Sequence, residues 1–265
     1  MGLARVLIIT AGTHAILSTM KMRDWPLILT LALIRAEKTI LLIETRNPVV
    51  LMPSLYSVLV HTSKAWQVQL MHPVGMRNIK HLRQLAHHFS RNFTATRLAE
   101  TNFKGGDAYS QLLYKSTFWE QVLGEHILLV QADSIMCRAG IDDYLIYDYI
   151  GAPWVHKPDG LAIGNGGFSL RRRSAMLKCL DPRFYNGNFT WPEDMYFAKC
   201  VRSIGTLPST AVAKTFAVES LFSPAPLAVH KIFHWERSKV YTTAILCEFC
   251  PLLLTVPATN IVCPL

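Results

Sequence analysis

Short apolar, β-branched runs alternate with longer segments of helical periodicity over the first half of the chain. The expected strands cover residues 39–44, 66–71, 96–100 and 126–131, and the expected helices cover residues 49–62, 77–89 and 107–122. Strands that alternate with helices at this spacing form βαβ units, in which parallel strands share one sheet. The pattern therefore predicts an α/β fold of the Rossmann type, with helices flanking the sheet.

Composition places the chain among globular proteins. Charged residues make up only 17% and hydrophobic residues 51% of the 265 residues, which is enough apolar material for a core. The net charge of +9 suits an anionic partner, such as nucleic acid, an anionic membrane surface or a phosphate-bearing substrate. Nucleic acid is disfavoured, because the sequence has no aromatic-plus-basic RNA signature and no helix-turn-helix or zinc-finger spacing.

Both ends of the chain are expected to lie outside the main domain. Residues 1–37 form an N-terminal extension whose apolar, sparsely basic character fits a leader, an anchor or an irregular segment. Each apolar run in it is shorter than the roughly 20 residues that a membrane span needs, so membrane anchoring stays open. The main domain is expected over residues 38–235, and a C-terminal tail over residues 236–265.

An acid follows the most apolar of the expected strands. Residues 126–131 read as a buried strand, and Asp133 comes two residues later. An isolated carboxylate at such a place is more often a cap or turn residue. Here an aromatic, proline-containing segment at 148–154 and a glycine-rich turn at 164–171 follow within fifty residues, which favours a binding site. In open parallel sheets ligands bind outside the carboxyl ends of the strands, where Glu44, Thr45 and Arg46 also fall.

The motifs in this order resemble the glycosyltransferase-like domain of unknown function family 5672, over roughly residues 38–235. The segments that carry the resemblance are Gln131-Ala-Asp133-Ser134, Asp148-Tyr-Ile-Gly-Ala-Pro-Trp154, Gly164-Asn-Gly-Gly-Phe-Ser-Leu-Arg171, Glu193-Asp194, Phe216-Ala-Val-Glu219 and Val229-His230-Lys231. That family in turn resembles nucleotide-sugar transferases with the GT-A fold. The resemblance implies a GT-A-like, Rossmann-type mixed sheet, mostly parallel and flanked by helices. It also implies transfer of a sugar from a UDP- or GDP-sugar donor to a hydroxyl of a glycan, protein or small-molecule acceptor.

The resemblance places the donor side of the site around Asp133. GT-A enzymes commonly carry an Asp-x-Asp motif here, but the triplet in this chain is Gln131-Ala132-Asp133 and lacks the first carboxylate. Asp133 and His230 are the expected ligands of Mn²⁺ or Mg²⁺, although His230 can also be an ordinary hydrogen-bonded loop residue. The other residues expected at the donor are Glu44, Thr45, Arg46, Gln131, Ser134, Gly166, Gly167 and Lys231. The incomplete motif leaves an alternative: a non-catalytic nucleotide- or carbohydrate-binding module on the same fold.

The resemblance places the acceptor side at Glu193 and Asp194. A carboxylate beside the acceptor hydroxyl can take its proton during an inverting displacement, so we assign Asp194 as the base and Glu193 as its acceptor-binding partner in the catalytic pair. The structural alternative is a helix-start acid pair that interacts with the helix dipole. Trp154 and Trp191 are expected to stack on acceptor sugar rings, unless they belong to the core.

The glycine pair and the cysteines each allow two interpretations. Gly166 and Gly167 either let backbone approach a sugar closely or form a turn that needs positive φ. Among the six cysteines only Cys247 and Cys250 have ligand-like spacing, and no second pair completes a zinc site, so their role is left open. Sequons at Asn92 and Asn188 matter only in the secretory route. The location is left open between the Golgi or secretory pathway, which suits a transferase, and the cytoplasm.

Overall fold

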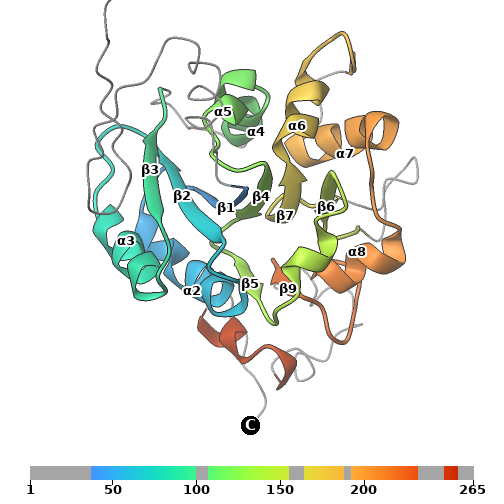
Figure 1. Ribbon diagram of the computed structural model, residues 1–265. Coiled ribbons are helices and arrows are strands. Elements are labelled where there is room, and N and C mark those ends of the chain that lie inside the picture. The colour runs from blue at the N-terminus through green and yellow to red at the C-terminus, as the bar shows by residue number, and fades with distance from the viewer. Residues whose placement is uncertain (1–36, 100–106, 155–163, 188–191, 232–247, 256–265) are drawn as a thin grey trace, which may run out of the picture. The chain divides into compact units, whose positions relative to one another are not determined.

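Two β-sheets organise the protein. The computed structural model describes residues 37–99, 107–154, 164–187, 192–231 and 248–255. The larger sheet contains, in spatial order, β3 (Phe93–Arg97), β2 (Trp66–His72), β1 (Lys38–Ile43), β4 (His126–Val130), β7 (Phe168–Arg172) and β6 (Tyr149–Gly151) (Figure 1). The smaller sheet contains β5 (Ser134–Met136), β9 (Ala228–His230) and β8 (Ala217–Val218).

The larger sheet is mixed and mostly parallel, as predicted. Strand β1 pairs in parallel with β2 and β4, and β2 pairs in parallel with β3. Strand β7 runs antiparallel to both β4 and β6. The parallel strands β1, β2 and β4 therefore end at one edge of the sheet, so the loops that follow them lie on the same side of the molecule.

Helices cover both faces of this sheet because its central strand is apolar on both sides. Ile40 and Leu42 of β1 pack in one cluster with side chains of α2 (Met52–His61), α3 (Ile79–His88) and α8 (Thr210–Phe216). Leu41, between them, packs in a second cluster with side chains of α4 (Asp107–Leu113), α5 (Ser116–Glu120), α6 (Arg173–Leu180) and α7 (Glu193–Ile204). Successive side chains of a strand face opposite sides, so the run at residues 39–43 dictates this three-layer arrangement.

Two expected elements differ from the structure. The third strand begins at Phe93, three residues earlier than expected, because β2 fixes the register by pairing Val68 with Phe93. The expected helix over residues 107–122 is divided into α4 and α5. The carbonyl of Leu113 at the break accepts a hydrogen bond of 2.7 Å from the Trp119 indole, which replaces a helical bond with a side-chain bond. Three short 3₁₀ helices, at Pro48–Leu51, Ile141–Tyr144 and Pro251–Thr255, complete the described elements.

The small sheet brings together segments that are distant in the sequence. Strand β5 runs antiparallel to β9 and places Ser134 opposite His230, while β9 runs parallel to β8. Strand β5 and helix α8 were not expected from the sequence. Because Asp133 immediately precedes β5, this register places it beside His230.

Part of the predicted C-terminal tail packs against the small sheet. Cys250 and Leu253 are buried with Ile135, Val218 and other side chains of that sheet. A disulfide joins Cys250 to Cys137 just after β5. The described segment 248–255 is therefore part of this core, and the partner of Cys250 is not Cys247, which lies outside the described residues.

A second disulfide joins helices α6 and α7. Cys179 on α6 bonds to Cys200 on α7, and every cysteine that the structure describes is in a disulfide. The predicted N-terminal extension lies outside the described residues except for Glu37. Within the described ranges, no helix combines the length and the apolar character that crossing a membrane requires.

Candidate functional site

The turn between β4 and β5 is held in place by hydrogen bonds to its neighbours. The backbone N–H of Gln131 and the hydroxyl of Ser134 both donate to the carbonyl oxygen of Gly167, at 2.8 and 2.9 Å. From the other side, the Ser54 hydroxyl of α2 donates to the Ala132 carbonyl at 3.0 Å. Ser134 therefore supports the turn by its hydroxyl, and the side chain of Asp133 is left 23% exposed at the carboxyl edge of the sheet.

Asp133 and His230, the two expected metal ligands, lie side by side. Asp133 Oδ1 lies 3.2 Å from His230 Nε2. The pair lacks hydrogen-bond geometry, and neither atom has another hydrogen-bond partner in the part of the chain that the structure describes. The Lys231 backbone N–H donates to the Asp133 carbonyl at 3.1 Å. Burial works to raise the pKa of Asp133, but the adjacent His230 and the Lys231 charge outweigh it and hold that pKa below its usual range.

A divalent cation fits this pair. An imidazole nitrogen and a carboxylate oxygen that lie 3.2 Å apart, both without a hydrogen-bond partner among the described residues, are ligand types that Mn²⁺ accepts. The other imidazole nitrogen, Nδ1, lies 3.7 Å from Glu219 Oε1, the kind of carboxylate that orients a ligating histidine. Among the described residues, no group of three or more His, Cys, Asp or Glu side chains gathers as a metal site. The described residues thus offer two ligands, and oxygen atoms of a bound ligand or of water would supply the rest.

Gly167 lies directly against the His230 ring. A Cβ atom at Gly167 would stand 2.0 Å from His230 Nε2, far inside van der Waals contact. A Cβ atom at Gly166 would stand 2.3 Å from Glu193 Oε1 and 2.8 Å from Arg171 Nη2. Neither glycine has positive φ, so a turn that requires positive φ is not the reason for the pair. Their small size makes room for side chains of the protein itself, and their predicted contact with a sugar stays a prediction.

Asn165 links the glycine turn to Glu219, the carboxylate beside His230, and its role was missed in the sequence. Its Oδ1 accepts from the Gly167 N–H at 2.8 Å, and its Nδ2 donates to Glu219 Oε2 at 2.7 Å. Both Asn165 and Glu219 stand inside motifs that drew attention to this region. The motifs do not reveal which side chains bridge them, because that depends on how residues 54 positions apart come together.

Asp194 occupies the first turn of α7, as predicted, and faces the glycine turn. Its Oδ2 accepts from the Gly166 N–H at 3.2 Å, and its Oδ1 accepts from the Met195 N–H at 2.7 Å. The residue is partly buried. Burial, together with the negative charge of Glu193, raises the pKa of Asp194 to about 7, against the opposing effects of Arg171 and the two backbone hydrogen bonds. A carboxylate with this pKa can exchange a proton near neutral pH.

Glu193 pairs with a buried arginine. Both of its carboxylate oxygens accept from Arg171, at 2.7 and 3.1 Å. Glu193 is only 4% exposed and Arg171 is fully buried. Glu193 is therefore a buried ion-pair residue, and its predicted contact with an acceptor stays a prediction.

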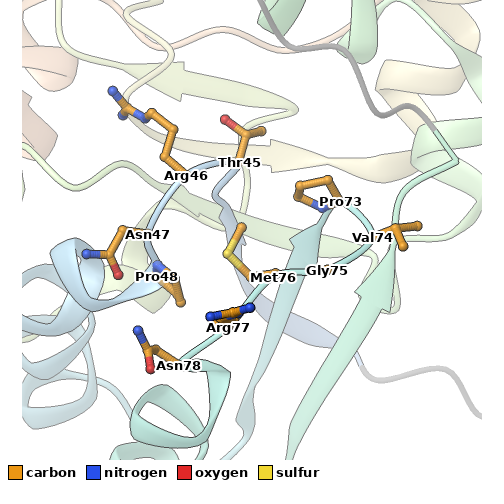
Figure 2. A pocket seen from close by; sticks show the side chains of 10 residues that line it. All are labelled: Thr45, Arg46, Asn47, Pro48, Pro73, Val74, Gly75, Met76, Arg77 and Asn78. Carbon is orange, nitrogen blue, oxygen red and sulfur yellow. The ribbon is translucent and has the colours of Figure 1, made fainter.

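A pocket of about 360 Å³ opens between the loops that follow β1 and β2. Figure 2 shows these loops facing each other, with Arg46 on one and Arg77 on the other. Its lining residues are Thr45, Arg46, Asn47, Pro48, Pro73, Val74, Gly75, Met76, Arg77 and Asn78. Glu44 is 5% exposed and its Oε1 accepts from the Thr45 and Arg46 N–H groups at 2.9 and 2.7 Å. Glu44 therefore shapes the loop, whereas Thr45 and Arg46 line the pocket.

Of the two tryptophans predicted at the acceptor, the structure describes Trp154. Trp154 is partly exposed and follows β6, in a segment tied to the glycine turn by the hydrogen bond of 3.1 Å from the Asn165 N–H to the Ala152 carbonyl. Its contact with an acceptor stays a prediction. Trp191 lies outside the described residues.

A family model described as "Protein of unknown function (DUF5672)" matches residues 92–230, which is more than half of the chain. The chain belongs to this family. Asp133, the glycine turn, Asp194 and His230 all lie within the matched region. The residues that the structure brings together here therefore belong to the family's segment. A search among curated protein sequences found no match.

Solved glycosyltransferase structures are similar at low identity. Apo GlyE from Streptococcus pneumoniae TIGR4 has a TM-score of 0.48 and 11% identity, covering 80% of this chain and 62% of the GlyE chain. TarS 1–349 from S. aureus has a TM-score of 0.47 and 13% identity, covering 84% and 73%. The mannosyltransferase PcManGT from Pyrobaculum calidifontis, in complex with GDP-Man and Mn²⁺, has a TM-score of 0.44 and 13% identity, covering 66% and 56%. At TM-scores below 0.5 we draw no conclusion on activity from them.

Substituting Gly167 by alanine tests the packing at the centre of the site. We expect Gly167→Ala to displace His230 and to weaken Mn²⁺ binding by at least tenfold, with a loss of about 1–3 kcal/mol of unfolding free energy from overpacking. Calorimetric Mn²⁺ titration and urea unfolding measure the two effects. The matched control is Gly124→Ala, whose Cβ would stand 2.5 Å from Thr39 Oγ1 before β4 begins. If both variants lose stability and neither loses Mn²⁺ affinity, His230 is not a ligand.

Proposed function

We propose that this protein is a glycosyltransferase that moves a sugar from a nucleotide-sugar donor to a hydroxyl acceptor. The observation that carries the proposal is the convergence of three predicted residues on one glycine turn. Asp133 and His230 face each other beside Gly167, and Asp194 accepts from the N–H of Gly166. The pair proposed to hold a cation (Asp133 and His230) and the candidate base thus lie beside two consecutive glycines just before β7. A displacement between a donor and an acceptor needs such groups close together.

Asp133 and His230 would hold the divalent cation on the donor side. A cation bound here neutralises the charge that develops on the leaving diphosphate, which is the chemistry that sugar transfer from a nucleotide needs. Lys231 follows His230 directly and adds a positive charge to the same place. The missing carboxylate at Gln131 then means fewer protein ligands, with the donor phosphates completing the coordination.

Asp194 would act as the general base on the acceptor side. The acceptor oxygen forms a bond with the anomeric carbon while the bond from that carbon to the phosphate oxygen breaks. The bonding electron pair leaves with the nucleoside diphosphate, and the hydroxyl proton passes to the Asp194 carboxylate. Attack opposite to the leaving group inverts the anomeric carbon. A pKa of about 7 suits a group that must be deprotonated before the reaction and protonated after it.

The pocket after β1 and β2 is the place proposed for the nucleotide. It lies at the same carboxyl edge of the sheet as Asp133, because β1, β2 and β4 are parallel neighbours. Two arginines and the polar side chains of Thr45, Asn47 and Asn78 line it. Guanidinium groups bind phosphate oxygens, and amide side chains can bind a base or a ribose.

Alanine variants of the two acids test the assignment of the site. We expect Asp194→Ala to lower sugar transfer by about 10²–10⁴-fold, because the base is lost, without unfolding the protein. We expect Asp133→Ala to abolish Mn²⁺-dependent transfer. The measurement is release of UDP or GDP from a panel of donor sugars, with circular dichroism to check folding. Asp181→Asn is the control, because the Asp181 side chain is 23% exposed, like that of Asp133, but pairs with Arg183 away from the site.

Two outcomes of this assay contradict parts of the proposal. Full activity in both variants would remove Asp133 and Asp194 from the site. Donor binding without turnover by the unaltered protein, across donors and acceptors, would favour the non-catalytic binding module that the incomplete Asp-x-Asp motif left open.

Removing the pocket arginines tests the nucleotide position. We expect the double variant Arg46→Ala, Arg77→Ala to bind UDP or GDP about tenfold more weakly, because charge-assisted hydrogen bonds to phosphate are lost. Isothermal titration calorimetry at two salt concentrations measures this change. Arg183→Ala is the control, because Arg183 is 82% exposed, much like Arg46 at 86%, and lies outside the pocket. Equal nucleotide affinity in all three proteins would place the nucleotide elsewhere.

We also propose that the chain is made in the secretory pathway. Two disulfides among the described residues suit an oxidising compartment, and Asn92 of the Asn92-Phe93-Thr94 sequon is exposed where edge strand β3 begins. In eukaryotic cells, we expect peptide-N-glycosidase to lower the apparent mass of the full chain. Asn92→Gln should remove one glycan, and Thr94→Ser should keep it. A wild-type chain whose mass does not change on this treatment would contradict the proposal.

A further inference from the structure

Arg171 is a buried cation in an aromatic surrounding. Its side chain is fully buried, and its guanidinium carbon lies 4.9 Å from the ring centre of Tyr149 and 5.8 Å from those of Trp119 and Phe197. Its Nε donates to the Ser169 hydroxyl at 2.9 Å. A charge removed from water in this way needs an anionic partner, because burial of an unpaired charge is strongly unfavourable.

Two carboxylates compete for this single cation. Glu193 and Asp194 are consecutive residues, and both lie against Gly166: a Cβ atom there would be 2.3 Å from Glu193 Oε1, 2.8 Å from Arg171 Nη2 and 3.2 Å from Asp194 Cβ. Glu193 accepts from both terminal guanidinium nitrogens in a bidentate pair. Among the described residues, Asp194 accepts from backbone N–H groups, those of Gly166 and Met195. The bidentate face of the cation is therefore occupied by the residue beside the candidate base.

We propose that Glu193 is a positioning residue that engages the buried Arg171 and so keeps this cation from pairing with Asp194, which stays basic enough to take a proton from an acceptor hydroxyl. The inference deepens the proposed function and rests on it for the role of Asp194. It explains why two consecutive acids are needed at the start of α7. A lone aspartate there would pair with Arg171 and become a weaker base, since an adjacent arginine favours the charged form of a carboxyl group.

The other groups that interact with Asp194 do not oppose this arrangement. Three tyrosine phenols interact with Asp194, and burial raises the pKa of each. They belong to Tyr109 in α4, Tyr114 directly after α4 and Tyr149 in β6. These phenols are therefore neutral near pH 7. Despite burial, the pKa of Arg171 is raised by Glu193, so the guanidinium stays charged. Burial and Glu193 thus raise the pKa of Asp194, while Arg171 and the two backbone hydrogen bonds lower it.

An NMR titration of the Asp194 carboxyl group tests the inference without relying on activity. The full chain is labelled with ¹³C-aspartate, and the Asp194 signal is assigned by its loss in Asp194→Asn. In Glu193→Gln the pair is broken, so we expect the Asp194 midpoint to fall by about 1–3 pH units. The acid limb of the pH profile of sugar transfer should fall by the same amount. Glu193→Asp keeps the charge, and its midpoint should remain near that of the wild type.

A double variant covers the case in which Glu193→Gln does not fold. Arg171→Met, Glu193→Gln removes both charges from the buried site, and the Asp194 midpoint should then stay raised by burial alone. A midpoint near the ordinary aspartate value in the double variant would overturn the inference, because no cation is left to lower it. An unchanged midpoint in a folded Glu193→Gln variant would also overturn it, and would reduce the pair to a structural role.

The titration separates this inference from the proposed function. If the midpoint moves as expected but no variant or wild-type protein transfers sugar, the electrostatic inference holds and the transferase proposal fails. If Asp194→Asn abolishes transfer while Glu193→Gln leaves the midpoint unchanged, the transferase proposal holds and the role of Glu193 is wrong.

Discussion

The absence of a side chain at Gly167 is the constraint on which the site depends. It allows the His230 imidazole to lie against the start of β7, so that the small sheet joins the large one at the carboxyl edge of the parallel strands. The carbonyl of the same residue holds the turn that carries Asp133. One glycine therefore fixes both members of the cation pair, and any larger residue would separate them.

The arrangement of the acidic residues Glu193 and Asp194 depends on a buried ion pair. Arg171 cannot remain charged in its aromatic surrounding without a carboxylate, and Glu193 supplies it. Among the described residues, the neighbouring Asp194 accepts hydrogen bonds from two backbone N–H groups, and its pKa is raised. The same helix start thus provides one acid for structure and one for the proposed chemistry, and the difference lies in their partners.

Much of the fold could be predicted because the strand signals are local. The run at residues 39–43 is apolar on both faces, and this alone predicts a sheet covered on two sides. Asp133, His230 and Asp194 could be nominated because they stand in motifs that resemble those of a family. The protein partners of Glu44 and Glu193 could not be predicted, because an acid at a strand end or helix start looks the same whether it faces a ligand or a buried partner.

By itself, the sequence determined the alternation of the first four strands with helical segments, the position of an acid beyond the fourth strand and the family to which the chain belongs. Only the tertiary structure decided which of these residues meet. The pairing of β5 with β9, the bond between Cys137 and Cys250 and the contact of Arg171 with Glu193 all join segments that are separate in the chain. Such contacts depend on the register between strands and on the space left by small residues, and neither is encoded in local periodicity.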